Sequence, residues 1–191
     1  MSGIAVPGRT ATHVPQAVAA PVACISVPVP QSRAATGYDA SMAGIELRSA
    51  AFDDGAYIPR RCAKDGDDVS PALSWSGVPD GTTELLLLCE DPDAPSGTFV
   101  HWLVTGIDPT SEGVEAGQTP PGGQERPTGW GEPGWGGPRP PAGDKAHRYF
   151  FRIYALPGPV SLPGDATAGD VHAAVDQQAL ASGTLVGLYQ R

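Results

Sequence analysis

The sequence that decides the fold runs from residue 84 to residue 104 and reads ELLLLCEDPDAPSGTFVHWLV. It opens with a continuous apolar run, Leu85 to Cys89, which lies between an Asp-Gly pair and the acidic proline segment Asp91–Pro95. That length and those flanks favour a β-strand buried on both faces. A second apolar run, Phe99 to Val104, is rich in aromatic and branched residues and predicts another strand. The stretch therefore indicates two strands separated by a rigid turn that carries two carboxylates.

Other segments also have the pattern of strands. Ile45–Ser49 alternates apolar and polar residues, as a half-buried strand does. Tyr149–Tyr154 is aromatic and branched, and Leu185–Tyr189 is suited to a last strand. With 25 glycines and 21 prolines in 191 residues, we expect short elements joined by many turns, and not a helical bundle.

One helix is predicted near the C-terminus. Thr167 and Asp170 have the spacing of a capping box, with Asp in the position usually taken by Glu. Val171 and Val175 then fall on one face of the helix, and Gly183 is expected to end it. The histidine beside the first of these valines is expected to face solvent.

A segment of about 37 residues, 108–144, has no clear element, which is unusual inside a compact domain. It contains Gly129-Trp130-Gly131, an echo of that motif at Gly134-Trp135-Gly136, and then Gly137-Pro138-Arg139-Pro140-Pro141. Glycine permits close backbone approach, proline fixes φ, and tryptophan supplies area that holds a loop down. We therefore expect this loop to line a site.

The charge balance excludes one class of partner. The chain has 12 Lys and Arg against 21 Asp and Glu, a net charge of −9 with neutral histidines, whereas nucleic-acid binding depends on clustered cations. We therefore expect no nucleic-acid partner. The longest aliphatic run, Leu85–Leu88, is far shorter than the ~20 residues of a transmembrane helix, so no transmembrane segment is predicted.

The cysteines bear on metals and on cellular compartment. Cys24, Cys62 and Cys89 have neither the spacing of a metal site nor an even number for a disulfide framework. We expect no metal, and no motif indicates a cofactor. An acidic chain with few cysteines favours a cytoplasmic location.

Residues 1–42 differ in composition from the rest of the chain. They carry five prolines among Ala, Val, Ser and Thr, with only three charged residues. Proline disfavours regular structure around it, so we expect a disordered Pro/Ala-rich tail and a folded domain over residues 43–191. The alternative is a signal sequence, or a lipoprotein signal that ends at Cys24. Pro15 and Pro21 interrupt that segment, and no basic region opens it.

Two of the domain's histidines are candidates for chemistry. His101 lies in an apolar strand, where an imidazole needs a hydrogen-bond partner, and the nearest candidates are the carboxylates of Asp91 and Asp93. His147 begins the aromatic strand, directly after the proline-rich loop, and is followed by Tyr149. We interpret the two acids, two imidazoles and one phenol as a candidate constellation.

Four motifs, in this order, resemble the signature of the phosphatidylethanolamine-binding proteins and of their bacterial Raf-kinase-inhibitor-like branch: Asp91-Pro92-Asp93-Ala94-Pro95, His101-Trp102, Gly137-Pro138-Arg139-Pro140-Pro141 and His147-Arg148-Tyr149. The resemblance covers residues 45–190. It implies a mainly β (α+β) fold, in which a large antiparallel sheet packs on a smaller one with a few edge helices. It also implies a small pocket for phosphate-like and carboxylate groups, including a phosphoethanolamine head group. The implied pocket residues are Asp91, Asp93, His101, Gly137, Pro138, Pro140, Pro141, His147 and Tyr149.

The chemistry of these residues agrees with such a pocket. Imidazole N–H groups and a tyrosine hydroxyl donate hydrogen bonds to an anion, and an aspartate can fix the orientation of an imidazole. Arg139 stands where the family commonly has a small residue or cysteine. It would either strengthen anion binding by a charge-assisted hydrogen bond or point into solvent.

We therefore expect a non-enzymatic protein that binds a small anion or a phospholipid head group, and that could regulate a phosphorylated partner in this way. One alternative is an acid–base enzyme, a cyclase or isomerase, that uses His101, Asp91, His147 and Tyr149. The other alternative is a protease inhibitor. The sequence contains no Gly-x-Ser-x-Gly motif, so covalent catalysis is not predicted.

Overall fold

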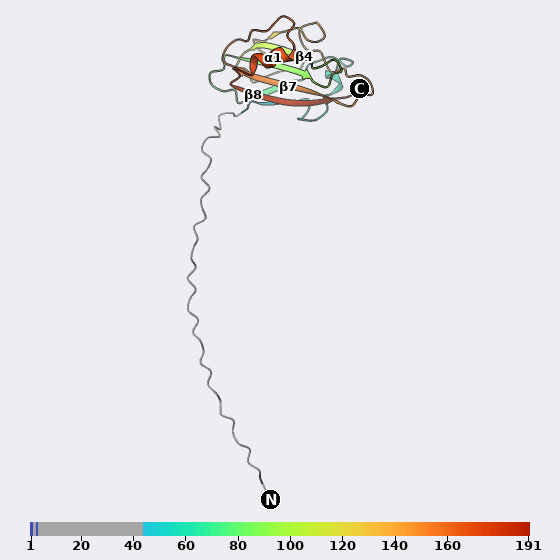
Figure 1. Ribbon diagram of the computed structural model, residues 1–191, viewed down its shortest axis with the longest axis vertical. Helices are drawn as coiled ribbons and strands as arrows, with labels where there is room; N and C mark the ends of the chain where they lie inside the picture. The colour runs from blue at the N-terminus through green and yellow to red at the C-terminus, as the bar shows by residue number, and fades with distance from the viewer. Residues whose placement is uncertain (2, 4–43) are drawn as a thin grey trace. The chain divides into compact units, whose positions relative to one another are not determined.

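The structure is a computed structural model that describes residues 1, 3 and 44–191 (Figure 1). The predicted tail, residues 1–42, lies outside the described residues except for two positions, and so does Cys24. Both the disordered tail and its alternative, a signal ending at Cys24, stay predictions. From residue 44 onward the chain forms two antiparallel sheets and one short α-helix, as the mainly β expectation requires.

The larger sheet has five strands in the order β6-β4-β3-β7-β8. These are β3 (Glu84–Asp91), β4 (Phe99–Ile107), β6 (Gln124–Glu125), β7 (His147–Leu156) and β8 (Ala181–Tyr189). All neighbours pair antiparallel, and β7 and β8 lie side by side in Figure 1. Because β3 is the central strand, Leu85–Leu88 are completely buried, which confirms the interpretation of that run.

The smaller sheet has the order β1-β2-β5, and the main core lies between the two sheets. Its strands are β1 (Glu46–Ser49), β2 (Leu73–Ser76) and β5 (Gly113–Val114), and a 3-10 turn, η1 (Arg60–Cys62), lies between β1 and β2 in the chain. Leu47 and Trp75 of this sheet pack in one cluster with Leu87 and Trp102 of the larger sheet. Burying each such side chain contributes about 1.5 to 3 kcal/mol, so this layer supplies much of the folding free energy.

A second core covers the outer face of the larger sheet. It joins Leu86, Leu88 and Leu103 to the inward valines of the helix α1 (Ala168–Val175), which Figure 1 labels. The capping box is confirmed, since the Asp170 N–H donates to Thr167 Oγ1 at 3.2 Å and the Thr167 N–H donates to Asp170 Oδ2 at 2.9 Å. The described residues form one α-helix and one 3-10 turn, whereas the family resemblance implied a few edge helices.

The end of the helix and the start of the last strand differ from the prediction. The helix ends at Val175, and Gly183 lies inside β8 and does not end a helix. A Cβ atom at residue 183 would lie 2.1 Å from the carbonyl oxygen of Ile45, so this glycine permits the close approach of the two segments. The alternation of buried and exposed residues starts at Ala181, and the strand therefore extends four residues further upstream than expected.

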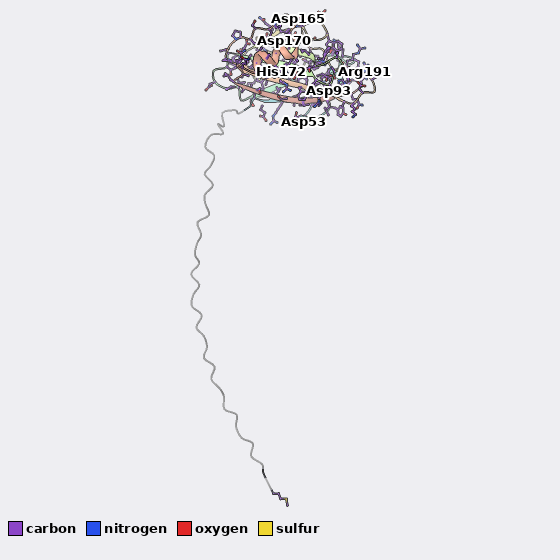
Figure 2. The ribbon with its side chains drawn as sticks, in the orientation of Figure 1. Asp53, Asp93, Asp165, Asp170, His172 and Arg191 are labelled. Atoms are coloured by element: carbon purple, nitrogen blue, oxygen red, sulfur yellow. The ribbon has the colours of Figure 1, made fainter. Side chains whose placement is uncertain are left out.

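The expectation that His172 faces solvent holds only in part, because its side chain is one-third exposed while both ring nitrogens lie against other side chains. Its Nε2 lies 3.0 Å from Oε2 of Glu90, a carboxylate that is 4% exposed, and its Nδ1 lies 3.3 Å from the hydroxyl of Tyr154. Arg152 also donates from Nε to Oε1 of Glu90 at 2.8 Å. A buried charge requires partners, and the histidine supplies one from the helix (labelled in Figure 2). The sequence placed His172 beside an inward valine but did not show that the carboxylate of Glu90, one residue before the end of β3 at Asp91, lies on the same side.

Candidate ligand-binding pocket

A β-bulge in β4 determines where the side chain of His101 points. Cys89 pairs with Trp102 and Glu90 pairs with Val100, so His101 is the extra residue without a partner on β3. Val100 and Leu103 both pack in the outer core, whereas Trp102 packs between the sheets. The bulge thus reverses the alternation and places His101 on the same face as Trp102, a re-aiming typical of bulges next to binding sites.

His101 is clamped to the loop that precedes the prolines. Its Nδ1 lies 2.6 Å from the carbonyl oxygen of Gly136, while the Gly136 N–H donates to the His101 carbonyl at 2.9 Å. The expected partner, a carboxylate of the Asp91–Asp93 turn, is therefore wrong, because the long loop returns a backbone carbonyl to this position. Burial, which outweighs these hydrogen bonds, lowers the pKa of His101 below its ordinary 6.5.

Asp91 is instead the partner of His147. Nδ1 of His147 donates to Oδ2 of Asp91 at 2.8 Å, and both residues are at least 95% buried. The bond joins the end of β3 to the start of β7 and fixes the orientation and tautomer of the imidazole. On its other side, Nε2 of His147 lies 3.9 Å from Oδ2 of Asp144, an exposed residue of the loop.

Tyr149 has a hydroxyl group that makes no hydrogen bond of ordinary length and angle with the described residues. The residue is completely buried, its ring lies 5.1 Å from that of His101, and its hydroxyl has no hydrogen-bond partner in the described part of the chain. Burial, with a further contribution from the charge of Asp91, raises the pKa of Tyr149 far above its ordinary value of 10. The hydroxyl therefore stays protonated and is a hydrogen-bond donor, and the neighbouring carboxylate of Asp91 is already bonded to His147.

Gly137 and Pro138, which the family resemblance implied as ligand-binding residues, instead anchor the proline-rich loop to the segment after η1. The Gly137 N–H donates to Oδ1 of Asp68 at 2.8 Å, and the Pro138 carbonyl accepts from the Lys64 N–H at 3.0 Å. A Cβ at residue 137 would lie 2.1 Å from the carbonyl oxygen of Cys62. Gly137 therefore permits close approach to the 62–64 segment and not, as expected, to a ligand.

Aromatic side chains hold the same loop against the sheet. Trp135 stacks on Phe151 with ring centroids 5.9 Å apart, and its Nε1–H donates to the Cys62 carbonyl at 3.0 Å. Trp130 packs edge-on against Phe99 at 5.0 Å and remains 37% exposed. The two Gly-Trp-Gly motifs thus anchor the loop, as predicted.

These elements enclose a cavity of about 170 Å³ that opens to solvent. It is lined from β3, β4, β7, the turn after β3 and the glycine- and proline-rich loop, by Asp91, Ala94, Pro95, Ser96, Phe99, His101, Trp130, Arg139, Pro140, Pro141, His147 and Tyr149. Arg139 is exposed and lies on the cavity wall, and it has no carboxylate partner within the described range. No group of three or more metal-ligating side chains occurs among the described residues.

The cavity brings together six of the nine implied pocket residues: Asp91, His101, Pro140, Pro141, His147 and Tyr149. Gly137, Pro138 and Asp93 do not line it. Asp93 (labelled in Figure 2) accepts two hydrogen bonds from the Arg148 guanidinium, at 2.7 and 2.8 Å, and one from its backbone N–H at 3.0 Å. It supports the site by tying the turn after β3 to β7.

Sequence reasoning missed the aromatic wall of the cavity. Phe99 and Trp130 line it beside His101, and the Phe99 and His101 rings lie 4.9 Å apart. The spacing of Phe99 and His101, two residues along one strand, indicates a shared face and was a usable signal. No comparable signal in the sequence joins Trp130 to His101, because the contact depends on the path of the loop.

The comparison with family models decides the relationship that the motifs indicated. Residues 48–190 match the model described as phosphatidylethanolamine-binding protein. The chain belongs to this family. A relative in the family, a UPF0098 protein of Methanothermobacter thermautotrophicus, is 42% identical over 152 residues, which are 77% of this chain and 99% of the relative.

Other relatives and solved structures extend the comparison. LppC of Mycobacterium tuberculosis, whose name marks it as a candidate lipoprotein, is 43% identical over 146 residues, 76% of this chain and 72% of LppC. CT736 of Chlamydia trachomatis, described as a homologue of the family, superposes with a TM-score of 0.69 at 33% identity, over 78% of this chain and 98% of CT736. YbcL of E. coli, described as a new member of the mammalian family, gives 0.72 at 26% identity, over 78% and 99%.

The comparisons leave the cellular location open between two predictions. In the part of the chain that the structure describes, no helix is long and apolar enough to cross a membrane. The relationship to LppC is a reason to keep the lipoprotein alternative beside the cytoplasmic prediction.

Proposed function

We propose that the cavity binds a small oxyanion: inorganic phosphate, the phosphate of a phosphoethanolamine head group, or a carboxylate. The observation that carries the proposal is the Tyr149 side chain in the cavity wall, whose buried hydroxyl makes no hydrogen bond of ordinary length and angle with the described residues. A buried donor without a partner costs about 1 to 3 kcal/mol. An anionic oxygen in the cavity would remove that cost.

The surroundings of the hydroxyl supply the positive potential that an anion needs. Arg139 adds a guanidinium at the opening, where a charge-assisted hydrogen bond to an oxyanion is about twice as strong as a neutral one. The two cavity prolines, Pro140 and Pro141, restrict the wall before binding and so lower the cost of ordering it. The carboxylate of Asp91 is held by His147, which reduces its repulsion of a bound anion.

Calorimetric titration with phosphate tests the proposal. The wild-type chain should bind phosphate saturably, and His101→Ala and His147→Ala should each weaken binding by about 1.5 to 3 kcal/mol, the scale of a hydrogen bond to a charged group. Arg48→Gln is the matched control, since it removes an exposed cation of the smaller sheet that does not line the cavity. Absence of saturable binding, or unchanged affinity in both histidine variants, would refute the proposal.

The same site supports acid–base catalysis as a second candidate, because Asp91 and His147 have the geometry of a carboxylate-oriented general base. The two candidates predict different fates for a bound phosphate ester. Phosphorus NMR of O-phosphoethanolamine incubated with the protein should show an unchanged ester if the site only binds. Conversion that His147→Ala abolishes would favour the enzyme.

A further inference from the structure

We propose that Lys64 and Asp68 are positioning residues, which hold Trp130 at the opening of the cavity and so slow the release of a bound anion. Both lie in the segment after η1, and neither lines the cavity. The effect on release rests on the oxyanion site proposed above, whereas the effect on Trp130 needs no ligand.

Trp130 is the part of the cavity wall that is most open to solvent among the aromatic rings that line it. Its ring meets those of Phe99 and His101 edge-on, with centroids 5.0 and 6.4 Å away, and the residue is still 37% exposed. Gly131, the next residue, has a φ of 87°, and a glycine-flanked turn gives the tryptophan backbone freedom. The ring therefore needs a further contact to remain at the opening.

Lys64 supplies that contact. Its ammonium lies 5.5 Å from the centroid of the Trp130 ring, within the ~6 Å range of a cation–π interaction. Its backbone N–H donates to the Pro138 carbonyl at 3.0 Å, so main chain and side chain both join this segment to the loop. The side chain has a flexible four-carbon stem, however, and the ammonium remains over the ring only if another group restricts it.

Asp68 is the group that restricts the lysine. Its Oδ2 accepts from the Lys64 ammonium at 2.6 Å, and its Oδ1 accepts from the Gly137 N–H at 2.8 Å. One carboxylate thus fixes the lysine and the loop relative to each other. Asp68 has a φ of 54° and is the only residue other than glycine with a positive φ in the described part of the chain. Aspartate and asparagine tolerate this conformation better than most residues, so the position suits a side chain that also supplies an acceptor.

Two substitutions separate a positioning role from a simple effect of charge. Lys64→Met removes a positive charge, and Asp68→Asn removes a negative one. If the pair acted on an anion only through its charge, Lys64→Met should weaken binding and Asp68→Asn should strengthen it. If the pair holds Trp130, both substitutions should speed release.

Asp68→Asn is also mild enough to leave the fold intact. Asparagine tolerates the positive φ and keeps an oxygen for the Gly137 N–H, so the substitution removes only the ion pair. The two side chains of that pair are 33% and 29% exposed, and ion pairs near the surface contribute little to stability. Melting curves of both variants should therefore stay close to that of the wild type.

Acrylamide quenching of tryptophan fluorescence on the ligand-free full chain tests whether the pair holds Trp130. All four tryptophans lie in the described part of the chain, and Trp75 and Trp102 are at most 3% exposed. Trp130→Phe shows how much of the quenched signal belongs to Trp130. Lys64→Met and Asp68→Asn should each raise the quenching constant above that of the wild type.

Two matched variants complete the quenching series. Lys64→Arg keeps a cation that can pair with Asp68 and lie over the ring, so it should restore the wild-type constant. Lys145→Met removes the only other lysine, an exposed residue with no ion pair or cation–π contact among residues 44–191, and should leave the constant unchanged. Unchanged quenching in both Lys64→Met and Asp68→Asn, or an equal rise in Lys145→Met, would overturn the inference.

The release rate of phosphate, from the exchange broadening of its phosphorus NMR signal, tests the consequence for the ligand. Lys64→Met and Asp68→Asn should each speed release about twofold to fivefold, the factor that corresponds to an exposed cation–π contact. If Asp68→Asn instead binds phosphate more tightly, or releases it no faster than the wild type, the pair acts through charge and the inference is overturned while the oxyanion site stands. If the wild type does not bind phosphate, the oxyanion site is refuted, and the effect on release falls with it.

Discussion

Replacing Tyr149 by Phe should change stability and affinity in opposite directions. The substitution removes only the hydroxyl and keeps the ring that packs in the main core, so it creates almost no cavity. In the free protein the hydroxyl is completely buried and makes no hydrogen bond of ordinary length and angle with the described residues. A bound anion would accept a hydrogen bond from this hydroxyl. Removing the hydroxyl should therefore raise the stability of the free protein and lower its affinity for the anion.

The magnitudes follow from the two states of that hydroxyl. Removing an unpaired buried donor should stabilise the free protein by about 1 kcal/mol, at the lower end of the desolvation cost, and raise the melting temperature by about 2 to 4 °C for a domain of this size. Removing a hydrogen bond to an anion should weaken binding by about 1.5 to 3 kcal/mol, or roughly 10- to 150-fold.

Thermal unfolding without ligand and calorimetric titration with phosphate, on the wild type and on Tyr149→Phe, measure both effects. A variant that melts lower than the wild type would mean that the hydroxyl has a structural partner such as Asp91, and the reasoning would be refuted. A variant with a higher melting temperature and unchanged affinity would show that the hydroxyl does not contact the ligand.

Three further substitutions test residues that stabilise the fold around the cavity without lining it. Gly137→Ala should destabilise the protein by about 1 to 3 kcal/mol, because its Cβ would lie 2.1 Å from a backbone oxygen of the facing loop; an unchanged denaturant midpoint would contradict this. Asp93→Asn removes a carboxylate whose pKa the Arg148 guanidinium lowers to about 2. The stability that this ion pair contributes is present above about pH 3.8 and is lost as the pH falls through 2. The difference in melting temperature between variant and wild type should therefore be largest near neutral pH and vanish near pH 2. A difference that persists near pH 2 would contradict the pairing of Asp93 with Arg148. His172→Ala leaves the buried carboxylate of Glu90 with one hydrogen-bond partner fewer and should lower the melting temperature while phosphate affinity stays the same. A matching loss of affinity would show that the outer layer is coupled to the cavity.

The sequence predicted well what depends on local pattern. The leucine run on β3, the capping box of α1 and the anchoring tryptophans of the long loop were all readable, because periodicity, spacing and residue type determine them. Family motifs added the large sheet on a smaller one and six residues of the cavity.

The pairing within the site was not readable, because it depends on backbone register. Asp91 lies ten residues before His101 in the chain, yet it bonds His147, since the bulge in β4 turns His101 toward the loop. Gly137 resembles a ligand-contacting glycine in sequence, but the 62–64 segment occupies the space next to it. Both errors come from contacts between distant parts of the chain, which no local pattern specifies.

The most direct test of the oxyanion site is an NMR titration of the histidine ring signals with phosphate, using His101→Ala to assign the resonances. The ring signals of His101 and His147 should shift together and saturate, while those of His172, on the outer face of the larger sheet, should not move. If neither cavity histidine shifts, or if His172 shifts as much as they do, the cavity is not the binding site for phosphate and the account is wrong.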